Sequence, residues 1–479
     1  MDDMLHVAFV TSEMAPFLKT GGLADVSAAL PKALARLGHR VTVVLPRYRG
    51  IAFPPGDFAG SVHVPVDSVT RSAGFYRRDL APGLEVVFIE HPPFFDRSEP
   101  YGDYGDNRLR FAFLARAALE YFRSRGDRPD VFHAHDWQTG LVPVYLKSFY
   151  WDDPTLHRCP SVFTIHNVAY QGVFGADTIA VLGLPWHLAS GDFLGFHDAI
   201  SYLKGGILFS EVVNTVSPTY AAEIQGTEHG YGFDGILRSR GPDLSGILNG
   251  VDYDEWDPAR DPHIAKSYSA ETLAGKAQCK ADLLRAFGLP EFPDLPVIGI
   301  TSRLVWQKGF DIVATAWYDL VQRPLRMVIL GTGEAAVQAG LWALHERDRE
   351  RFAVRFAYDE VLAHKIIAGS DMFLMPSRFE PCGLTQMYSL RYGTAPIVRS
   401  TGGLADTVSP FDGNNRGTGF RFDSADGTGL VWAIDQALAA FKQKKAWKSL
   451  QKNGMALDFS WERSARGYLD LYRRSARKV

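Results

Sequence analysis

Residues 376–386 hold the group of side chains best suited to chemistry in this sequence. They follow an apolar run typical of a buried strand, and the chain breaks at Gly383 before Thr385, which is expected to cap a helix. The backbone N–H groups of Gly383, Leu384 and Thr385 would then point out of the helix N-terminus, where anions bind readily. Glu380 precedes them and could reach hydroxyl groups on the molecule that carries the anion. The alternative is a capped helix with a glutamate on its surface.

Two cations, Arg303 and Lys308, follow another apolar run that ends near Thr301. An arginine binds phosphate oxygens through two parallel hydrogen bonds, whereas a lysine supplies a compact point charge. At the carboxyl end of a strand, the two suit a diphosphate and could stabilise its departure without a metal ion. The alternative is that both are surface residues in ordinary ion pairs.

The string Thr-Gly-Gly-Leu-Ala-Asp occurs twice, at residues 20–25 and 401–406. Each copy lies between an apolar run and an amphipathic helical pattern, which indicates a strand, a glycine loop and a helix. Glycines at such a turn let backbone N–H groups approach an anion or a sugar. Lys19 precedes the first copy and could add a third cation. Asp25 fits two interpretations equally well, a ligand contact and an acid stabilised by the helix dipole.

Polar side chains end two more apolar runs in the first half of the chain. The segment His133-Ala-His-Asp-Trp137 superficially resembles a metal motif of hydrolases, but Trp137 stands where the last histidine would be. No metal site is therefore predicted there. Asp136 is expected to contact a sugar beside the aromatic face of Trp137. His166 ends the next run, and its place beside a second polar strand end favours a substrate contact.

Apolar periodicity supplies the elements that must position these residues. Residues 6–12 predict a buried strand, apolar residues recur at helical spacing over 23–37, and residues 41–45 predict the next strand. This pattern indicates a βαβ unit with parallel strands, and it restarts after a turn-rich break at 247–258. The expected fold class is α/β with two doubly wound sheets, in which ligands bind at the carboxyl ends of strands. Further strands are predicted to end at His133, Ile165, Val216, Thr301, Leu330 and Met375.

Composition excludes several classes of partner. The 51 basic and 54 acidic residues give a net charge of −3, so there is no electrostatic case for nucleic acid or an anionic membrane. No apolar run approaches the roughly 20 residues of a membrane helix. The three cysteines are few and far apart, which argues for a reducing compartment. The acidic N-terminus lacks the basic region of a signal peptide, so a cytoplasmic, soluble protein is expected.

Six motifs, taken together and in order, closely resemble the bacterial glycogen synthases and plant starch synthases over essentially the whole chain. The motifs are Lys19-Thr-Gly-Gly-Leu, His133-Ala-His-Asp-Trp, Ile165-His-Asn, Ser302-Arg-Leu with Gln-Lys-Gly, Arg378-Phe-Glu-Pro-Cys-Gly-Leu and the second Thr-Gly-Gly-Leu. The resemblance implies a GT-B fold, in which two Rossmann-like domains face each other across a cleft. These would be residues 1–250 on the acceptor side and 251–455 on the sugar-nucleotide side, and a final helix in 456–479 would pack back on the first domain.

The resemblance also implies an activity and a set of site residues. Glucose would pass from ADP-glucose to the non-reducing end of an α-1,4-glucan such as glycogen, with retention of configuration and without a metal or other cofactor. Tyr358, which the sequence alone does not distinguish from a core tyrosine, would stack on adenine. The expected catalytic residues are Glu380, Asp136, His166, Arg303 and Lys308. The expected substrate-binding residues are Lys19, Gly21, Gly22, Asp25, Asn249, Tyr358, Cys382, Gly383, Leu384 and Thr385.

One position separates this chain from other transferases of the same fold. Sucrose- and trehalose-type transferases of the same fold usually carry a second glutamate in an E-x7-E pattern, and Tyr388 stands at that position here, as in the glycogen synthases. No carboxylate is clearly placed as a nucleophile. The residues therefore favour a same-face substitution, in which the departing phosphate helps to deprotonate the acceptor hydroxyl.

Three other functions are possible from the sequence. A transferase of the same fold could act on a small acceptor, and a non-catalytic protein could bind glucan. The second is disfavoured because a pure binder needs no diphosphate clamp such as Arg303 and Lys308. An α-glucan phosphorylase is disfavoured because those chains are much longer and carry pyridoxal phosphate.

Overall fold

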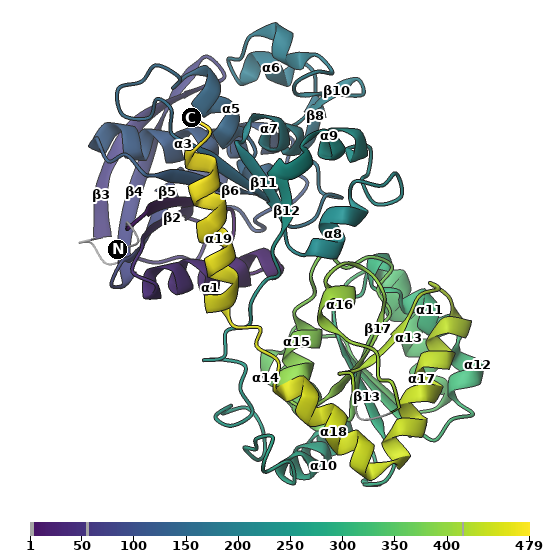
Figure 1. Cartoon of the computed structure of the whole chain (residues 1–479). Coiled ribbons are helices and arrows are strands. Elements are labelled where there is room, and N and C mark those ends of the chain that lie inside the picture. The colour runs from purple at the N-terminus through teal and green to yellow at the C-terminus, as the bar shows by residue number, and fades with distance from the viewer. Residues whose placement is uncertain (1–3, 54–56, 414–415) are drawn as a thin grey trace. The chain divides into compact units, whose positions relative to one another are not determined.

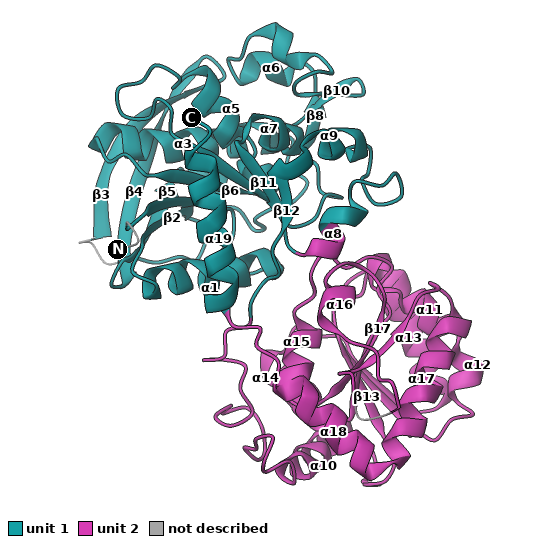
Figure 2. Cartoon of the chain, viewed as in Figure 1, with its two compact units in different colours: residues 1–216, 221–250, 461–479 teal, residues 217–220, 251–460 magenta. Residues whose placement is uncertain are grey.

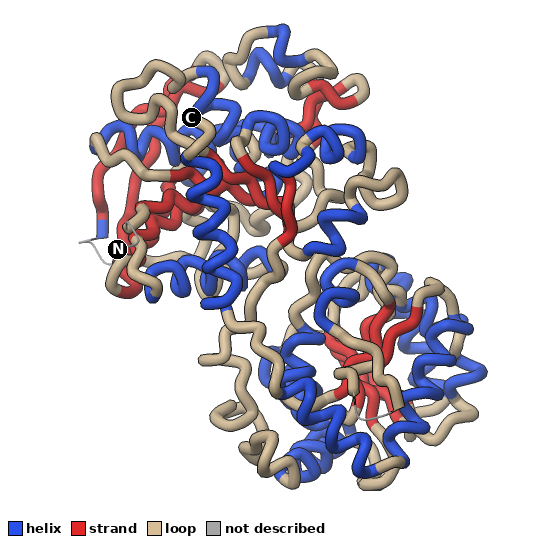
Figure 3. The backbone as a smooth tube through the Cα atoms, in the orientation of Figure 1, coloured by secondary structure: helices blue, strands red, loops and turns tan. Residues whose placement is uncertain are grey.

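A computed structural model describes residues 4–53, 57–413 and 416–479 of the chain. The chain forms two compact units, which are coloured separately in Figure 2. Unit 1 consists of residues 1–216, 221–250 and 461–479, and unit 2 consists of residues 217–220 and 251–460. In each unit the strands form a central sheet with helices around it (Figure 3). No helix in the described ranges is long and apolar enough to cross a bilayer.

Unit 1 is built on a nine-stranded sheet with the order β12-β11-β7-β6-β1-β2-β5-β4-β3 (Figure 1). The predicted βαβ unit is confirmed, because β1 pairs with β2 and with β6 in parallel. All five residues of β1, β6 and β7 are buried, as strands covered on both faces require. The strands of this sheet are β1 (His6–Val10), β2 (Arg40–Pro46), β3 (Phe58–Val66), β4 (Val69–Ala81), β5 (Leu84–Glu90), β6 (Val131–His135), β7 (Ser161–Ile165), β11 (Val212–Thr215) and β12 (Leu244–Gly246).

The sheet extends further than the sequence analysis predicted. Strands β3, β4 and β5 form antiparallel pairs at one edge, and a small separate sheet has the order β8-β10-β9. The residues of β3 and β4 are partly exposed, so these two strands lack the continuous apolar runs that marked the parallel strands. The small sheet consists of β8 (Val173–Gly175), β9 (Gly195–Phe196) and β10 (Ala199–Ser201).

The helices of unit 1 cover the sheet and bring the last segment of the chain back to the first. Helix α19, which begins at Trp461 as the periodicity predicted, packs against α1. Tyr468 and Tyr472 of α19 join the same core as β1 and β2. The helices are α1 (Gly22–Arg36), α2 (Pro92–Phe95), α3 (Asn107–Arg125), α4 (Asp136–Thr139), α5 (Leu141–Ser148), α6 (Thr178–Val181), η2 (Trp186–Ala189), α7 (Tyr202–Phe209), α9 (Asp234–Ser239), η3 (Gly241–Asp243) and α19 (Trp461–Ala476).

Unit 2 contains a six-stranded sheet with the order β15-β14-β13-β16-β17-β18, and every pair in it is parallel. The strands predicted at 297–301, 327–330 and 372–375 are confirmed as β13, β14 and β16. The strand bounds are β13 (Val297–Thr301), β14 (Arg326–Leu330), β15 (Phe352–Arg355), β16 (Met372–Met375), β17 (Ala395–Arg399) and β18 (Phe420–Phe422).

Helices surround this second sheet, and the loops after its strands carry the motifs singled out above. Helix α8 (Pro218–Glu223) begins in the short segment 217–220 that belongs to unit 2. The other helices of unit 2 are α10 (Gly275–Phe287), η4 (Trp306–Lys308), α11 (Phe310–Thr315), α12 (Trp317–Leu320), α13 (Ala335–Arg347), α14 (Glu360–Gly369), α15 (Thr385–Arg391), α16 (Gly402–Thr407), α17 (Gly427–Lys442) and α18 (Lys444–Met455).

Candidate active site

A buried ion pair joins two of the predicted catalytic residues in unit 2. Lys308 ends the short helix η4 after β13, and Glu380 lies in the loop after β16. The Nζ atom of Lys308 donates to Oε2 of Glu380 at 2.6 Å, and the Ser377 hydroxyl donates to the same oxygen at 2.9 Å. Glu380 is only 6% exposed. Two donors therefore hold this carboxylate oxygen in a fixed position.

A glycine brings these two loops together. Gly309 has φ +72°, and a Cβ atom there would overlap the carbonyl oxygen of Pro376. A side chain at this position would therefore push η4 away from the loop after β16. The close approach places Lys308 beside Glu380.

The second Thr-Gly-Gly motif supports the Glu380 loop from the other side. A Cβ atom at Gly402, where φ is +44°, would overlap the carbonyl oxygen of Glu380, and one at Gly403 would overlap that of Cys382. The backbone N–H of Gly403 also donates to the Glu380 carbonyl oxygen at 3.2 Å. The glycines of this copy therefore allow backbone to pack on backbone, and they hold the loop in place.

The segment 217–220 contacts both the Glu380 loop and the second Thr-Gly-Gly motif. The Ser217 hydroxyl donates to the carbonyl oxygen of Pro381 at 2.6 Å. Asp406, the last residue of the second motif, accepts from the Thr219 N–H at 2.9 Å and from its hydroxyl at 2.7 Å. These partners lie 164 and 187 residues apart in the chain, so no local pattern could have predicted them.

The predicted helix cap at Thr385 is wrong. Helix α15 begins at Thr385, its N-cap position is Leu384, and no side chain caps it. The Thr385 hydroxyl points instead to the sulfur of Met375, 3.3 Å away. Cys382 is buried, whereas Gly383, Leu384 and Thr385 are partly exposed. The backbone of this loop consequently remains without a side-chain cap at the helix start.

The other predicted residues of unit 2 lie toward solvent. Arg303 is exposed in the loop after β13. The backbone of this loop packs closely on two glycines, because a Cβ atom at Gly331 or Gly333 would overlap a carbonyl oxygen of the loop. Tyr358 follows β15 and is 73% exposed, so it is not a core tyrosine. Trp306, next to Lys308, is exposed with the Arg378 guanidinium 4.9 Å from its ring centre.

The first Thr-Gly-Gly motif lies in unit 1. Its glycines face open space, whereas the glycines of the second motif pack against backbone carbonyl groups. A Cβ atom added at Gly21 or Gly22 would meet no described atom within 4 Å. The Nζ atom of Lys19 pairs with Oδ1 of Asp25 at 2.7 Å. Asp25 lies in the first turn of α1, where the helix dipole also stabilises its charge. The same six residues thus hold a loop in one unit and leave room for a ligand in the other.

A residue that the sequence analysis missed shapes this first loop. The buried carboxylate of Glu13 accepts from the Thr20 N–H at 2.7 Å, the Thr20 hydroxyl at 2.6 Å and the Gly21 N–H at 3.3 Å. The Tyr101 hydroxyl donates to it at 2.7 Å. Glu13 lies three residues after the end of β1, so an acidic residue close to the carboxyl end of a buried strand was the sequence signal for this role.

Asp136 lies at the carboxyl end of β6 with φ +54°, a left-handed conformation that aspartate tolerates better than most residues. Its Oδ1 accepts from the His166 N–H at 2.7 Å, so the two predicted residues are neighbours. Burial raises the pKa of Asp136 to about 7, although the backbone N–H groups of His166 and Asn167 oppose the shift. A carboxyl with such a pKa can hold or release a proton near neutral pH.

His166 is held as a neutral ring. Burial lowers its pKa to about 3, and its Nε2 lies 3.1 Å from Nδ1 of His135. A single proton lies between these two nitrogens, so one ring donates and the other accepts. Each neutral imidazole then has one donor and one acceptor nitrogen. His133 is a structural residue, because its ring nitrogens contact the hydroxyls of Tyr472 at 2.9 Å and Thr164 at 2.6 Å.

Asn249 is buried in unit 1, and its side-chain oxygen finds no hydrogen-bond partner among the described residues. An unpaired acceptor of this kind is costly and indicates a missing partner. The predicted site residues are divided between the two units. Lys19, Gly21, Gly22, Asp25, Asp136, His166 and Asn249 belong to unit 1, and Arg303, Lys308, Tyr358, Glu380, Cys382, Gly383, Leu384 and Thr385 belong to unit 2.

Comparison with known proteins decides the family. Residues 6–239 match the model of the starch synthase catalytic domain, and residues 286–453 match that of glycosyl transferases group 1. A glycogen synthase of Koribacter versatilis is 48% identical over 477 residues, which cover 98% of each chain. One from an Anaeromyxobacter species is 49% identical over 474 residues, covering 98% of this chain and 99% of that one. The chain belongs to the glycogen synthase and starch synthase family. It is a glycosyltransferase.

A solved structure of the family supports the fold. The catalytic domain of starch synthase IV from Arabidopsis thaliana, bound to ADP and acarbose, is 37% identical with a TM-score of 0.91, over 99% of this chain and all of that one. Sucrose-phosphate synthase from Thermosynechococcus elongatus is 17% identical with a TM-score of 0.62 over 98% of each chain, which shows a shared fold alone. The fold is GT-B, with two Rossmann-like units, as predicted.

In this chain the tyrosine at the E-x7-E position has a structural partner. The Tyr388 ring stacks on Trp256 with centres 4.1 Å apart, and the other face of Trp256 stacks on His364 at 3.7 Å. The position of the second glutamate in the E-x7-E pattern is therefore occupied by a member of an aromatic stack. Tyr388 lies in α15 itself, which starts at the Glu380 loop.

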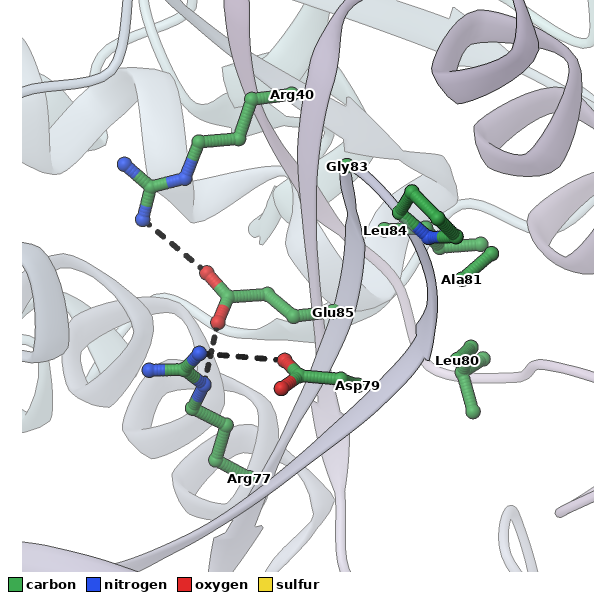
Figure 4. A pocket seen from close by; sticks show the side chains of 9 residues that line it. Arg40, Arg77, Asp79, Leu80, Ala81, Gly83, Leu84 and Glu85 are labelled. Carbon is green, nitrogen blue, oxygen red and sulfur yellow. Dashed lines mark hydrogen bonds and ion pairs between the residues drawn. The ribbon is translucent and has the colours of Figure 1, made fainter.

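A hollow in unit 1 is lined by none of the predicted site residues. It lies where β4 turns into β5, and Glu85 sits there between Arg40 and Arg77 (Figure 4). Arg77 pairs with Glu85 at 2.6 Å, and Arg40 pairs with Glu85 at 3.3 Å and with Asp127 at 2.8 Å. The cations are neutralised within the protein, so the hollow offers no net charge to an anion.

Proposed function

We propose that this protein is a glycogen synthase, which transfers glucose from ADP-glucose to the non-reducing end of an α-1,4-glucan with retention of configuration. Residues 1–250 would form the acceptor-side domain and residues 251–455 the sugar-nucleotide domain, with the last helix packed on the first. The observation that carries this proposal is the Lys308–Glu380 ion pair in a loop held by glycine backbone contacts. Family membership supplies the donor and the acceptor class.

The sugar nucleotide would bind to the loops at the carboxyl ends of the strands. Arg303 and Lys308 would hold the diphosphate by charge, and the backbone at Gly383–Thr385 would contact its oxygens. Glu380 would accept hydrogen bonds from glucose hydroxyls, and the exposed ring of Tyr358 would stack on adenine. In unit 1, Lys19 and the open space at Gly21 and Gly22 would receive the other part of the ligand.

The chemical step would be a same-face substitution at the anomeric carbon. The bond between that carbon and the β-phosphate oxygen breaks, and ADP leaves with the electron pair. The C4 hydroxyl oxygen of the acceptor bonds to the anomeric carbon on the same face, and its proton passes to a phosphate oxygen. The two cations stabilise the charge that develops on the diphosphate, so no metal ion is needed for this step.

The carboxylates near the proposed reaction centre are engaged in ways that fit this route. Glu380 accepts from Lys308 and Ser377, and Asp136 accepts from backbone N–H groups. A retaining double displacement needs a carboxylate free to attack the anomeric carbon, whereas these hydrogen bonds occupy both groups. The neutral ring of His166 would donate or accept a hydrogen bond to a glucose hydroxyl beside Asp136.

The three cysteines are free and buried, which fits a reducing compartment. We therefore propose that the reaction takes place in the cytoplasm, with no role for nucleic acid or membrane.

The linkage and the product size test this proposal. Protein is incubated with ADP-glucose and maltopentaose, and the products are examined by mass spectrometry and proton NMR. We expect a ladder of longer oligosaccharides with new α-1,4 linkages. A single small glycoside, or a β-linkage, would contradict the proposal. A covalent glucosyl adduct at Glu380 or Asp136 in the quenched enzyme would replace the same-face step by a double displacement.

A further inference from the structure

Three side chains of unit 2 converge away from the Lys308–Glu380 pair. Glu360 and His364 are four residues apart on α14, so they project from the same face of that helix. Glu255 joins them from the irregular segment that enters unit 2 after residue 250. One ligand atom from each of the three residues lies within 4.8 Å of the others. Both glutamates are exposed, so an ion could reach the group from solvent.

His364 is oriented as metal-binding histidines are. Its ring is 1% exposed and lies against the Trp256 ring. Its Nδ1 contacts Oδ2 of Asp261 at 2.8 Å, and the Tyr392 hydroxyl donates to the same oxygen at 2.6 Å. A carboxylate on one ring nitrogen fixes the tautomer and leaves the other nitrogen as a lone-pair ligand.

The second nitrogen of His364 has nothing to bind in the protein. Its Nε2 is buried and has no hydrogen-bond partner among the described residues. A buried polar atom without a partner is costly, and native structures seldom keep one without a reason. Since Asp261 occupies Nδ1, Nε2 is the atom that His364 offers to the two glutamates. The carboxylate cluster is therefore accompanied by an independent sign of a ligand.

We propose that Glu255, Glu360 and Nε2 of His364 bind one divalent transition-metal ion of the zinc class. An imidazole with two carboxylates suits zinc, cobalt or nickel, whereas calcium and magnesium prefer oxygen ligands alone. Bonds of about 2.1 Å would bring the ligand atoms to roughly 3.4 Å from one another in a tetrahedral site. The two exposed glutamate side chains would turn toward Nε2 of His364 when the ion binds.

The ion would be structural, separate from glucose transfer. It would tie the segment that contains Glu255 to the first turn of α14, whose N-cap is Asp359. Tyr358, the proposed adenine contact, directly precedes that cap. The ion would therefore stabilise the start of α14 and the loop before it, while the Lys308–Glu380 pair continues to work without metal. The spacing of the three residues in the sequence gave no metal signal, because Glu255 lies far from the helix.

Direct metal binding tests the site. Untagged full-length protein is stripped with a chelator and titrated with Zn²⁺ in competition with a chromophoric chelator, and Co²⁺ is used as a spectroscopic probe. We expect one equivalent of Zn²⁺ to bind, a visible Co²⁺ band of a low-symmetry site, and a higher melting temperature with the ion than without it.

Conservative variants of the exposed ligands locate the ion without disturbing the aromatic stack. Glu255→Gln and Glu360→Gln should each weaken Zn²⁺ binding at least tenfold and alter the Co²⁺ band, while the metal-free melting temperature stays near that of the wild type. Glu346→Gln is the matched control, an exposed glutamate of unit 2 that should leave binding unchanged. The proposal is overturned if stripped protein binds no stoichiometric ion, or if both glutamine variants bind Zn²⁺ as tightly as the control.

Discussion

Nζ of Lys308 lies 2.6 Å from Oε2 of Glu380, and both side chains are largely shielded from water. The cation proposed to hold the diphosphate is thus anchored by the carboxylate proposed to hold the sugar. This arrangement costs little reorganisation when the ligand arrives, because the lysine is already in place. It also leaves Glu380 engaged by a cation, which suits hydrogen bonding better than nucleophilic attack.

Loss of the lysine should affect catalysis more than folding. Lys308→Ala is expected to lower turnover at least about 100-fold, the scale of losing one preorganised charge in a transition state. Ser377 continues to donate to Glu380, so the protein should remain folded with a modest loss in melting temperature. Steady-state rates with ADP-glucose and thermal unfolding measure the two effects.

A second ion pair of unit 2, between a lysine and an aspartate, supplies the control for Lys308→Ala. Nζ of Lys280 pairs with Oδ2 of Asp371 at 2.7 Å. Lys280→Ala should lower the melting temperature at least as much as Lys308→Ala, with little change in turnover of the folded fraction. Parallel losses of turnover and stability in both variants would refute a specific role for Lys308.

The two glycine motifs should respond differently to alanine. At Gly402 a methyl group would overlap the Glu380 carbonyl oxygen at a positive φ, so Gly402→Ala is expected to cost several kcal/mol of stability. At Gly22 the methyl group meets open space at the start of α1, where alanine is a better helix former by up to about 1 kcal/mol. Gly22→Ala should therefore keep its stability and raise the KM for ADP-glucose. Denaturant unfolding and initial rates separate the two, and equal stability losses would contradict this division of roles.

Glu13 should act as a positioning residue. Glu13→Gln places an amide N–H₂ group among four donors from Thr20, Gly21 and Tyr101, so the first glycine loop should move. We expect at least a tenfold lower kcat/KM. Tyr101→Phe removes one donor and should have a smaller effect. If Tyr101→Phe proved as damaging as Glu13→Gln, the loop contacts would not be the reason for the loss.

Asp136 should make stability depend on pH. Its pKa is raised by burial to about 7 in the folded protein, whereas the unfolded chain has an ordinary value of 3.8. Between these values the folded state binds the extra proton, so this group's contribution to the free energy of unfolding falls as pH rises from about 4 to about 7 and is constant above that. Each pKa unit corresponds to about 1.4 kcal/mol.

Asp136→Asn removes this titration while keeping an oxygen acceptor and a side chain that tolerates the left-handed backbone. Relative to wild type, the variant should gain stability between pH 5 and pH 8 and lose most of its activity. Urea unfolding at the two pH values gives the comparison. A stability difference that does not change with pH would show that Asp136 does not titrate in this range.

The sequence predicted the parts of the fold that local periodicity determines. The helix beginning near Leu23, the strand of Met372–Met375 and the last helix after Trp461 all have apolar faces that recur at a fixed spacing, and all are present. Strands β3 and β4 lacked a continuous apolar run because one face is exposed, so the periodicity missed them.

Contacts between distant residues set the limits of prediction at the site. The pairing of Glu13 with Thr20 and the support of Pro381 by Ser217 depend on how loops meet in space. Thr385 has the residue type of a helix cap, but it is the first residue of α15, after the N-cap Leu384, and its hydroxyl points to the sulfur of Met375. Motifs therefore predicted which loops matter, and three-dimensional packing decided which side chains hold them.

The most direct test of the proposed function is a donor competition with metal-depleted protein. Chelator-treated enzyme receives glycogen with radiolabelled ADP-glucose or UDP-glucose, and label in precipitated glucan is counted. The Lys308–Glu380 ion pair and the proposed chemistry predict strong incorporation of label from ADP-glucose without added metal. No incorporation from either donor, in a sample shown to be folded, would contradict the proposed function.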